Sequence, residues 1–126
     1  MSKLRRTLLI LAVAALLPAL GRAQSTTAFD GTYAGVSREV FRNNPIQPGR
    51  CFGQSGVPGP LEIKNGIVQK HGEQGWEGSV GPQGALVMHG ANGSRFEGQI
   101  DSQGTISGRI AGPLCSVTFV WRKQPR

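Results

Sequence analysis

The sequence contains 126 residues, including 19 glycines and 8 prolines, and carries a formal net charge of +7. This length suits one domain with a modest core and argues against two domains. A basic chain would suit an anionic partner such as nucleic acid, but four of the cations lie within the first 22 residues. The basic character therefore belongs largely to the N-terminal segment.

The N-terminal segment, residues 1–23, has the three parts of a secretory signal peptide. A basic start precedes an apolar run from Leu8 to Leu17, and small residues follow at the positions that a signal peptidase reads. We predict cleavage after Ala23, with cleavage after Gly21 as the alternative. The apolar run is shorter than the about 20 residues that span a bilayer. This run suits the general secretory route, while LRRTLLI partly matches a twin-arginine signal and keeps that route as an alternative.

The mature chain, residues 24–126, is expected to be one all-β domain that is exported to the periplasm or secreted. Cys51 and Cys115 are its only cysteines, and disulfides persist in those compartments. A bridge between them would close a loop of about 65 residues and stabilise the fold by about 4 kcal/mol on the chain-entropy account. A metal pair or a catalytic thiol would need a matching histidine or acid at useful spacing, which these cysteines lack.

Beyond Gln24, short runs of alternating apolar residues are separated by Gly, Pro, Asn and Asp. This pattern is typical of an antiparallel β meander and contains almost no helical periodicity. The predicted strands are residues 32–40, 61–64, 67–70, 76–80, 85–89, 95–100, 105–110 and 115–122. A Pro- and Gly-rich loop at about 42–60 separates the first two strands, and its four prolines exclude a regular central strand.

Three turns share one sequence pattern, which predicts the register of the strands beside them. Residues 81–84, 90–93 and 101–104 each end on glycine, as required by a type I turn followed by a left-handed residue. The resulting three-residue loops predict the pairs Val80 with Leu86, Gly78 with Met88, Met88 with Phe96, Ile100 with Ile106 and Gly98 with Gly108. A two-residue Asn-Gly turn at 92–93 would instead pair Met88 with the charged Glu97.

This register predicts one buried and one solvated face of the sheet. The expected buried face carries Trp76, Val80, Leu86, Met88, Phe96, Ile100, Ile106, Ile110, Val117, Phe119 and Trp121. The opposite face carries Glu77, Ser79, Arg95, Glu97, Gln99, Ser107 and Arg109. Glycines 78, 98 and 108 fall on the buried face, where they indicate strong bending or close packing of an aromatic ring. Bent strands in meander order predict a small β-barrel of about seven or eight strands, with a two-layer sandwich as the alternative.

No catalytic constellation, metal site or cofactor motif is predicted. His71 and His89 lack ligands at metal-binding spacing. Glu77 and Glu97 occupy equivalent positions and could form a glycosidase-type carboxylate pair, but Arg95 and Arg109 on the same face explain them as ion-pair partners. An enzyme using Glu77, Glu97 or His89 is the last alternative. Nucleic-acid binding is not expected either, because it would require exposed aromatic residues beside a basic stripe.

Three segments of the mature chain, FDGTYAG at 29–35, LEIKNGIV at 61–68 and GPLCSVTFVW at 112–121, resemble small exported bacterial proteins that are known only as uncharacterised. The resemblance implies an exported all-β domain and brings no activity or site with it. In outline the meander is also similar to avidin-like and lipocalin-like barrels, without a binding motif that could be carried over.

We therefore expect a non-catalytic binding or interaction protein whose partner is a small apolar ligand or an envelope or extracellular protein. The candidate surface consists of Trp76, Met88, Phe96 and Trp121, and the site is expected either at the barrel mouth near Trp76 and Trp121 or in the loop around Cys51. The alternatives are a small-ligand-binding barrel and an inhibitor or adhesion module that acts through the loop at 42–60.

Overall fold

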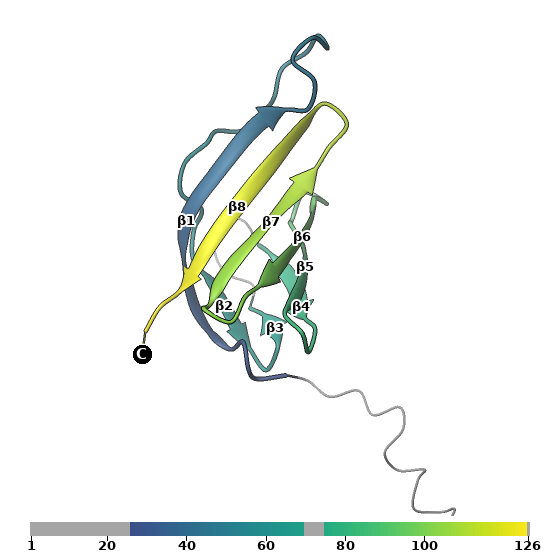
Figure 1. The fold of residues 1–126 in the computed structure, drawn as a ribbon. Helices are drawn as coiled ribbons and strands as arrows, with labels where there is room; N and C mark the ends of the chain where they lie inside the picture. The colour runs from purple at the N-terminus through teal and green to yellow at the C-terminus, as the bar shows by residue number, and fades with distance from the viewer. Residues whose placement is uncertain (1–25, 70–74, 126) are drawn as a thin grey trace, which may run out of the picture.

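The computed structural model describes residues 26–69 and 75–125, so the predicted signal peptide and His71 lie outside the described residues. The strands are β1 (Gly31–Arg42), β2 (Leu61–Lys64), β3 (Ile67–Val68), β4 (Glu77–Val80), β5 (Ala85–His89), β6 (Arg95–Ile100), β7 (Thr105–Ala111) and β8 (Cys115–Lys123). They run antiparallel in chain order and close through β1 and β8 into one barrel (Figure 1). The predicted all-β barrel is confirmed, and the described residues contain no helix.

The register follows the turn chemistry that the sequence predicted. The observed pairs include Val80 with Leu86, Gly78 with Met88, Met88 with Phe96, Ile100 with Ile106 and Gly98 with Gly108. The last glycine of each of the three turns is left-handed, with φ of 93° at Gly84, 87° at Gly93 and 82° at Gly104. These angles are the ones that a type I turn with a glycine bulge requires.

The hairpin between β2 and β3 uses a tighter turn. Asn65 and Gly66 both have positive φ, 54° and 74°, which is the pattern of a two-residue type I′ turn. The carboxylate of Asp30 accepts hydrogen bonds from the N–H groups of both residues, at 2.7 and 3.0 Å. β3 ends at Val68, earlier than the predicted 67–70, and Lys70 lies outside the described residues.

At one end of the barrel, here called the closed end, the backbone carbonyls of three turn glycines accept hydrogen bonds from neighbouring strands. Gly66, Gly84 and Gly104 each accept a hydrogen bond of 2.8 Å from the neighbouring hairpin or strand end, donated by Val80, Ile100 and Lys123 respectively. Phe29 packs against the core next to this ring of turns, and its carbonyl accepts a 2.6 Å hydrogen bond from the hydroxyl of the buried Tyr33. These bonds link neighbouring hairpins, and the last hairpin to the end of β8, at this end of the barrel.

Aromatic rings fill the middle of the barrel. Phe96 makes edge-to-face contacts with Trp76, Phe119 and Trp121, with ring centroids 5.6 to 6.2 Å apart. A Cβ added at Gly98 or Gly108 would lie 2.7 or 2.6 Å from the nearest Phe96 ring carbon. Close packing against an aromatic ring is therefore confirmed for Gly98 and Gly108, and the ring is that of Phe96, whereas a Cβ at Gly78 would meet Val87 and Met88. The wider core also includes Tyr33, Leu61, Ile63 and Val68.

A β-bulge in β1 changes which of its side chains face inward. Gly35 pairs with Trp121, but the next pair is Ser37 with Val120, so Val36 is an extra residue. Because successive side chains alternate between the two faces, the bulge reverses the facing of every later residue. Beyond it, the positions that pair with the inward-facing residues of β8 are Arg38, Val40 and Arg42.

Candidate functional site

The second end of the barrel, here called the open end, carries the loop 43–60 and the turns 90–93 and 112–114. In Figure 1 it is the upper end, where the long strands β1 and β8 project beyond the shorter ones. β1 pairs with β2 only over Gly31 to Tyr33, whereas it pairs with β8 from Tyr33 to Arg42. The wall of the barrel beside the upper half of β1 must therefore come from another segment.

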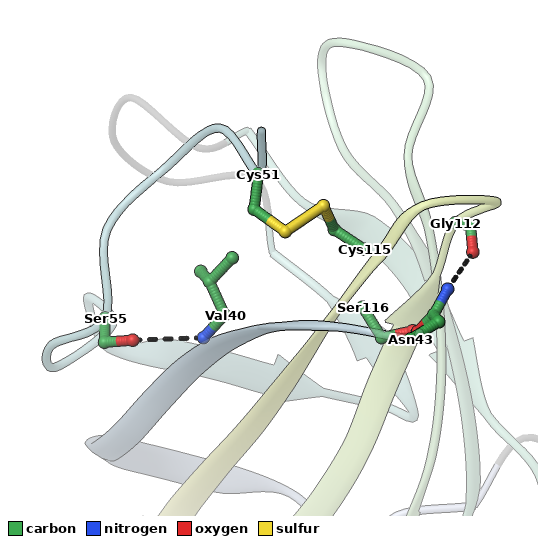
Figure 2. Close-up of a disulfide and its surroundings, with 7 residues drawn as sticks. All are labelled: Val40, Asn43, Cys51, Ser55, Gly112, Cys115 and Ser116. Atoms are coloured by element: carbon green, nitrogen blue, oxygen red, sulfur yellow. Dashed lines mark hydrogen bonds between the residues drawn. A yellow bond between two sulfur atoms is a disulfide. The ribbon is translucent and has the colours of Figure 1, made fainter. Parts of the chain in front are cut away.

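The predicted disulfide between Cys51 and Cys115 is present and ties the loop 43–60 to the start of β8. The bond has a Cα–Cα distance of 5.6 Å (Figure 2). Asn43, at the start of the loop, adds a side-chain anchor: its Nδ2 donates to the Gly112 carbonyl at 2.7 Å, and its Oδ1 accepts from Ser116 Oγ at 2.6 Å. These interactions fix the loop across the open end from both β1 and β8.

The second half of the loop runs along the edge of β1 that β2 leaves uncovered. Arg38 and Gly56 exchange two backbone hydrogen bonds of 2.6 and 2.7 Å, and Ser55 Oγ accepts from the Val40 N–H at 3.1 Å. The indole of Trp121 donates to the Gly59 carbonyl at 2.8 Å. Prolines in this segment prevent a regular ladder, as predicted, and yet the segment completes the wall.

A hollow of about 430 Å³ lies beneath this loop at the open end. This volume is within the range of small-molecule sites, which is about 300–1,000 Å³. Its described lining consists of Arg38, Val40, Phe52, Gly53, Trp76, Gly90, Ala91, Asn92, Ser94, Ile110, Val117 and Phe119. The inner wall is apolar and aromatic, whereas Asn92 and Ser94 form a polar rim on the turn between β5 and β6.

The guanidinium of Arg38 is held in place on the wall of this hollow. Its Nε donates to the Gln54 carbonyl at 2.8 Å, and its Nη2 donates to the same oxygen. Because both donors bind one oxygen of the loop, the guanidinium plane is fixed relative to the loop. Arg38 is the single charged residue in the described part of the lining.

The four residues of the candidate surface are all buried in the core. Met88, Phe96 and Trp121 have no exposed area, and Trp76 is 7% exposed. Of these four, Trp76 lines the hollow, where its ring lies edge-on to Phe119 with centroids 5.8 Å apart. The barrel mouth near Trp76 and the loop next to Cys51 were predicted as two separate sites. The structure brings them together, since Phe52 and Trp76 line the same hollow.

The residues considered for catalysis lie on the outer face. Glu77 and Glu97 are exposed on β4 and β6, with β5 between them, and His89 is exposed opposite Glu77 and Arg95. Arg95 pairs with Glu97 at 3.2 Å, but both residues lie on β6, so this exposed ion pair is within one strand and is not the expected pair across two strands. The two carboxylates are thus not brought together on adjacent strands.

The described residues contain neither a metal-binding cluster nor a membrane-spanning helix. No group of three or more His, Cys, Asp or Glu side chains is arranged there to hold a metal ion. The same residues include no helix with the length and apolar character needed to cross a membrane.

Sequence reasoning missed Arg38 and did not single out Phe52. The position of Arg38 depends on the bulge, for which the sequence pattern carried no signal, whereas Phe52 follows the cysteine around which the loop site was expected.

Comparison with protein-family models, curated proteins and solved structures found no significant match for this chain.

Proposed function

We propose that this protein is an exported, non-catalytic binding domain that holds a small, largely apolar ligand in the hollow at the open end. The observation that carries the proposal is the hollow of about 430 Å³, with an apolar inner wall and a polar rim, under a covalently tethered loop. Barrels commonly bind ligands at their mouths, and sites on a rigid frame lose little order on binding. The disulfide is compatible with an oxidising, exported location and supports export as part of the proposal.

The ligand experiment compares two valine-to-phenylalanine variants on β8. Val117→Phe adds a ring inside the hollow, whereas Val120→Phe places the same ring on the opposite face of the same strand. Isothermal titration with 1-octanol as the probe should show binding to the wild type and to Val120→Phe, and binding weakened at least tenfold in Val117→Phe. Absence of octanol binding to the wild type, or equal binding to both variants, would contradict the assigned site.

Export is tested by expressing the full chain and isolating it from the periplasm or the medium. The intact mass should correspond to a chain that begins at Gln24 and contains the disulfide. A product that retains residues 1–23 in the cytoplasm would contradict this part of the proposal.

A partner protein is the second candidate, and exposed apolar residues on the loop favour it. Ile46 is 89% exposed, Phe52 is 88% exposed and Val57 is 71% exposed. Large apolar side chains grouped on one exposed loop are typical of interaction sites. Ile46 does not line the hollow, so Ile46→Ser and Val117→Phe separate the two candidates. Loss of capture of an envelope protein in Ile46→Ser alone would favour the partner, and retention in both variants would oppose it.

A further inference from the structure

Because of the bulge in β1, two arginines face the inside of the open end, where an acidic and an apolar side chain would otherwise face inward. Arg38 and Arg42 lie on the inward face, while Glu39 and Phe41 lie on the outer face, with Phe41 43% exposed. Without the extra residue, alternation would turn Glu39 and Phe41 inward and both arginines outward. Exposing a phenylalanine and placing cations beside a core both oppose stability. Bulges that re-aim side chains in this way occur beside functional sites, which indicates a use for the cations.

The charge of Arg38 is not neutralised by its contacts. The Gln54 carbonyl accepts from two of its five N–H groups, and a carbonyl carries no net charge. Within the described residues Arg38 forms no ion pair, and no acidic side chain lines the hollow. Arg38, which lines the hollow, therefore keeps its positive charge and has unused donors beside an apolar wall.

Arg42 is the second arginine on the inward face of β1, and it does not line the hollow. It pairs with Cys115 in the β1–β8 ladder and lies beyond Val40 on the same inward face. Its Nε is buried and has no hydrogen-bond partner among the described residues. A buried donor without a partner costs stability, so the bulge carries a further energetic cost at Arg42.

We infer, on the basis of the proposed binding function, that the ligand is a small apolar molecule carrying one carboxylate. The carboxylate accepts hydrogen bonds from the unused N–H groups of Arg38, and the apolar body lies along Trp76, Val117 and Ile110. Guanidinium groups favour carboxylates because the two planar groups match in geometry and charge. Arg38 is the one charged residue in the described lining, and one negative charge balances it, which favours a monocarboxylate over a phosphate dianion.

The volume sets the size of this ligand. A hollow of about 430 Å³ lies in the lower part of the range of small-molecule sites, which is about 300–1,000 Å³. This capacity corresponds to a medium-chain carboxylic acid or a carboxylate on a small ring system.

The test compares three probes that share one tail and differ in head-group charge: octanoate, 1-octanol and octyltrimethylammonium. Titration calorimetry at neutral pH and constant ionic strength should show octanoate binding at least about tenfold more tightly than octanol, as a charge-assisted hydrogen bond predicts. Octyltrimethylammonium should bind more weakly than octanol. Arg38→Gln should remove the preference for octanoate, and Arg109→Gln, which changes an exposed arginine on the outer face of β7, should retain it.

Each outcome separates this inference from the function on which it rests. Equal binding of octanoate and octanol to the wild type, weakened in both cases by Val117→Phe, would overturn the carboxylate and leave the apolar site standing. Failure of all three probes would overturn both. A preference for octanoate that survives in Arg38→Gln would overturn the role of Arg38. If Arg38→Gln fails to fold, the order of the three wild-type affinities still tests the preference for a carboxylate, because that measurement requires no variant.

Discussion

Gly108→Ala tests whether the glycines of the inner face are required by close packing. A Cβ at position 108 would lie 2.5 Å from the Cα of Gly98 and 2.6 Å from Cζ of Phe96, and it would also overlap the Glu97 carbonyl oxygen. Two of these three neighbours are backbone atoms of β6, which cannot rotate away. The strands would have to separate, or the Phe96 ring would have to leave its contacts with Trp76, Phe119 and Trp121.

The expected loss follows from two opposing terms. Adding a methyl group to a well-packed site costs about 1–3 kcal/mol, and backbone overlap places this site at the upper end. Replacing glycine by alanine in a strand recovers about 0.5–1 kcal/mol, because alanine loses less conformational entropy on folding. The net decrease in the free energy of unfolding should be about 2 kcal/mol. For a domain of this size, that corresponds to a fall in Tm of about 8–16 °C.

The assay is urea denaturation followed by tryptophan fluorescence, with Gly56→Ala as the control. A Cβ at position 56 has no heavy atom within 4 Å, so this variant should change the free energy of unfolding by less than about 1 kcal/mol. The slope against urea should stay constant in both variants. A loss in Gly108→Ala that is no larger than that in Gly56→Ala would refute the packing argument.

Three further predictions concern stability. Replacing Cys51 and Cys115 together by serine should lower the free energy of unfolding by about 4 kcal/mol in urea denaturation, and a loss below about 1 kcal/mol would contradict the tethering role of the bridge. Asp30→Ala removes the acceptor for two N–H groups of the β2–β3 turn and should cost about 1–3 kcal/mol in thermal unfolding, whereas an unchanged Tm would show that the turn needs no support. Burial, together with the charge of Asp30, raises the pKa of Tyr33 above 10.0, so ultraviolet titration of this single tyrosine should have its midpoint above that value. Since the folded state favours the protonated phenol, this contribution to stability is present below about pH 10 and is lost as pH rises through the folded pKa. Tyr33→Phe should lack that loss of stability. An equal loss in the variant would show that another group causes it.

Local chemistry in the sequence accounts for much of the barrel. The glycine-ended turns at 81–84, 90–93 and 101–104 predicted which residues pair, because a turn of given length and handedness permits one register. Alternation then predicted the inward position of residues such as Leu86, Phe96 and Ile106, all of which are fully buried. The disulfide followed from a pair of cysteines in a chain that carries a predicted export signal. Each of these inferences needed only neighbours in the sequence or a very small number of candidates.

The tertiary structure decided how the open end is built. Closure between β1 and β8 joins residues from opposite ends of the mature chain, and the bulge at Val36 appears in that pairing and nowhere in the alternation pattern. The loop 43–60 has no periodic signal, because its path depends on the distant Cys115, Gly112 and Trp121. The sequence thus determined the register of β4 to β7 and the inward-facing residues of that part of the sheet through short-range turn geometry. Only long-range packing determined that the loop and the barrel mouth enclose one hollow and that Arg38 faces it.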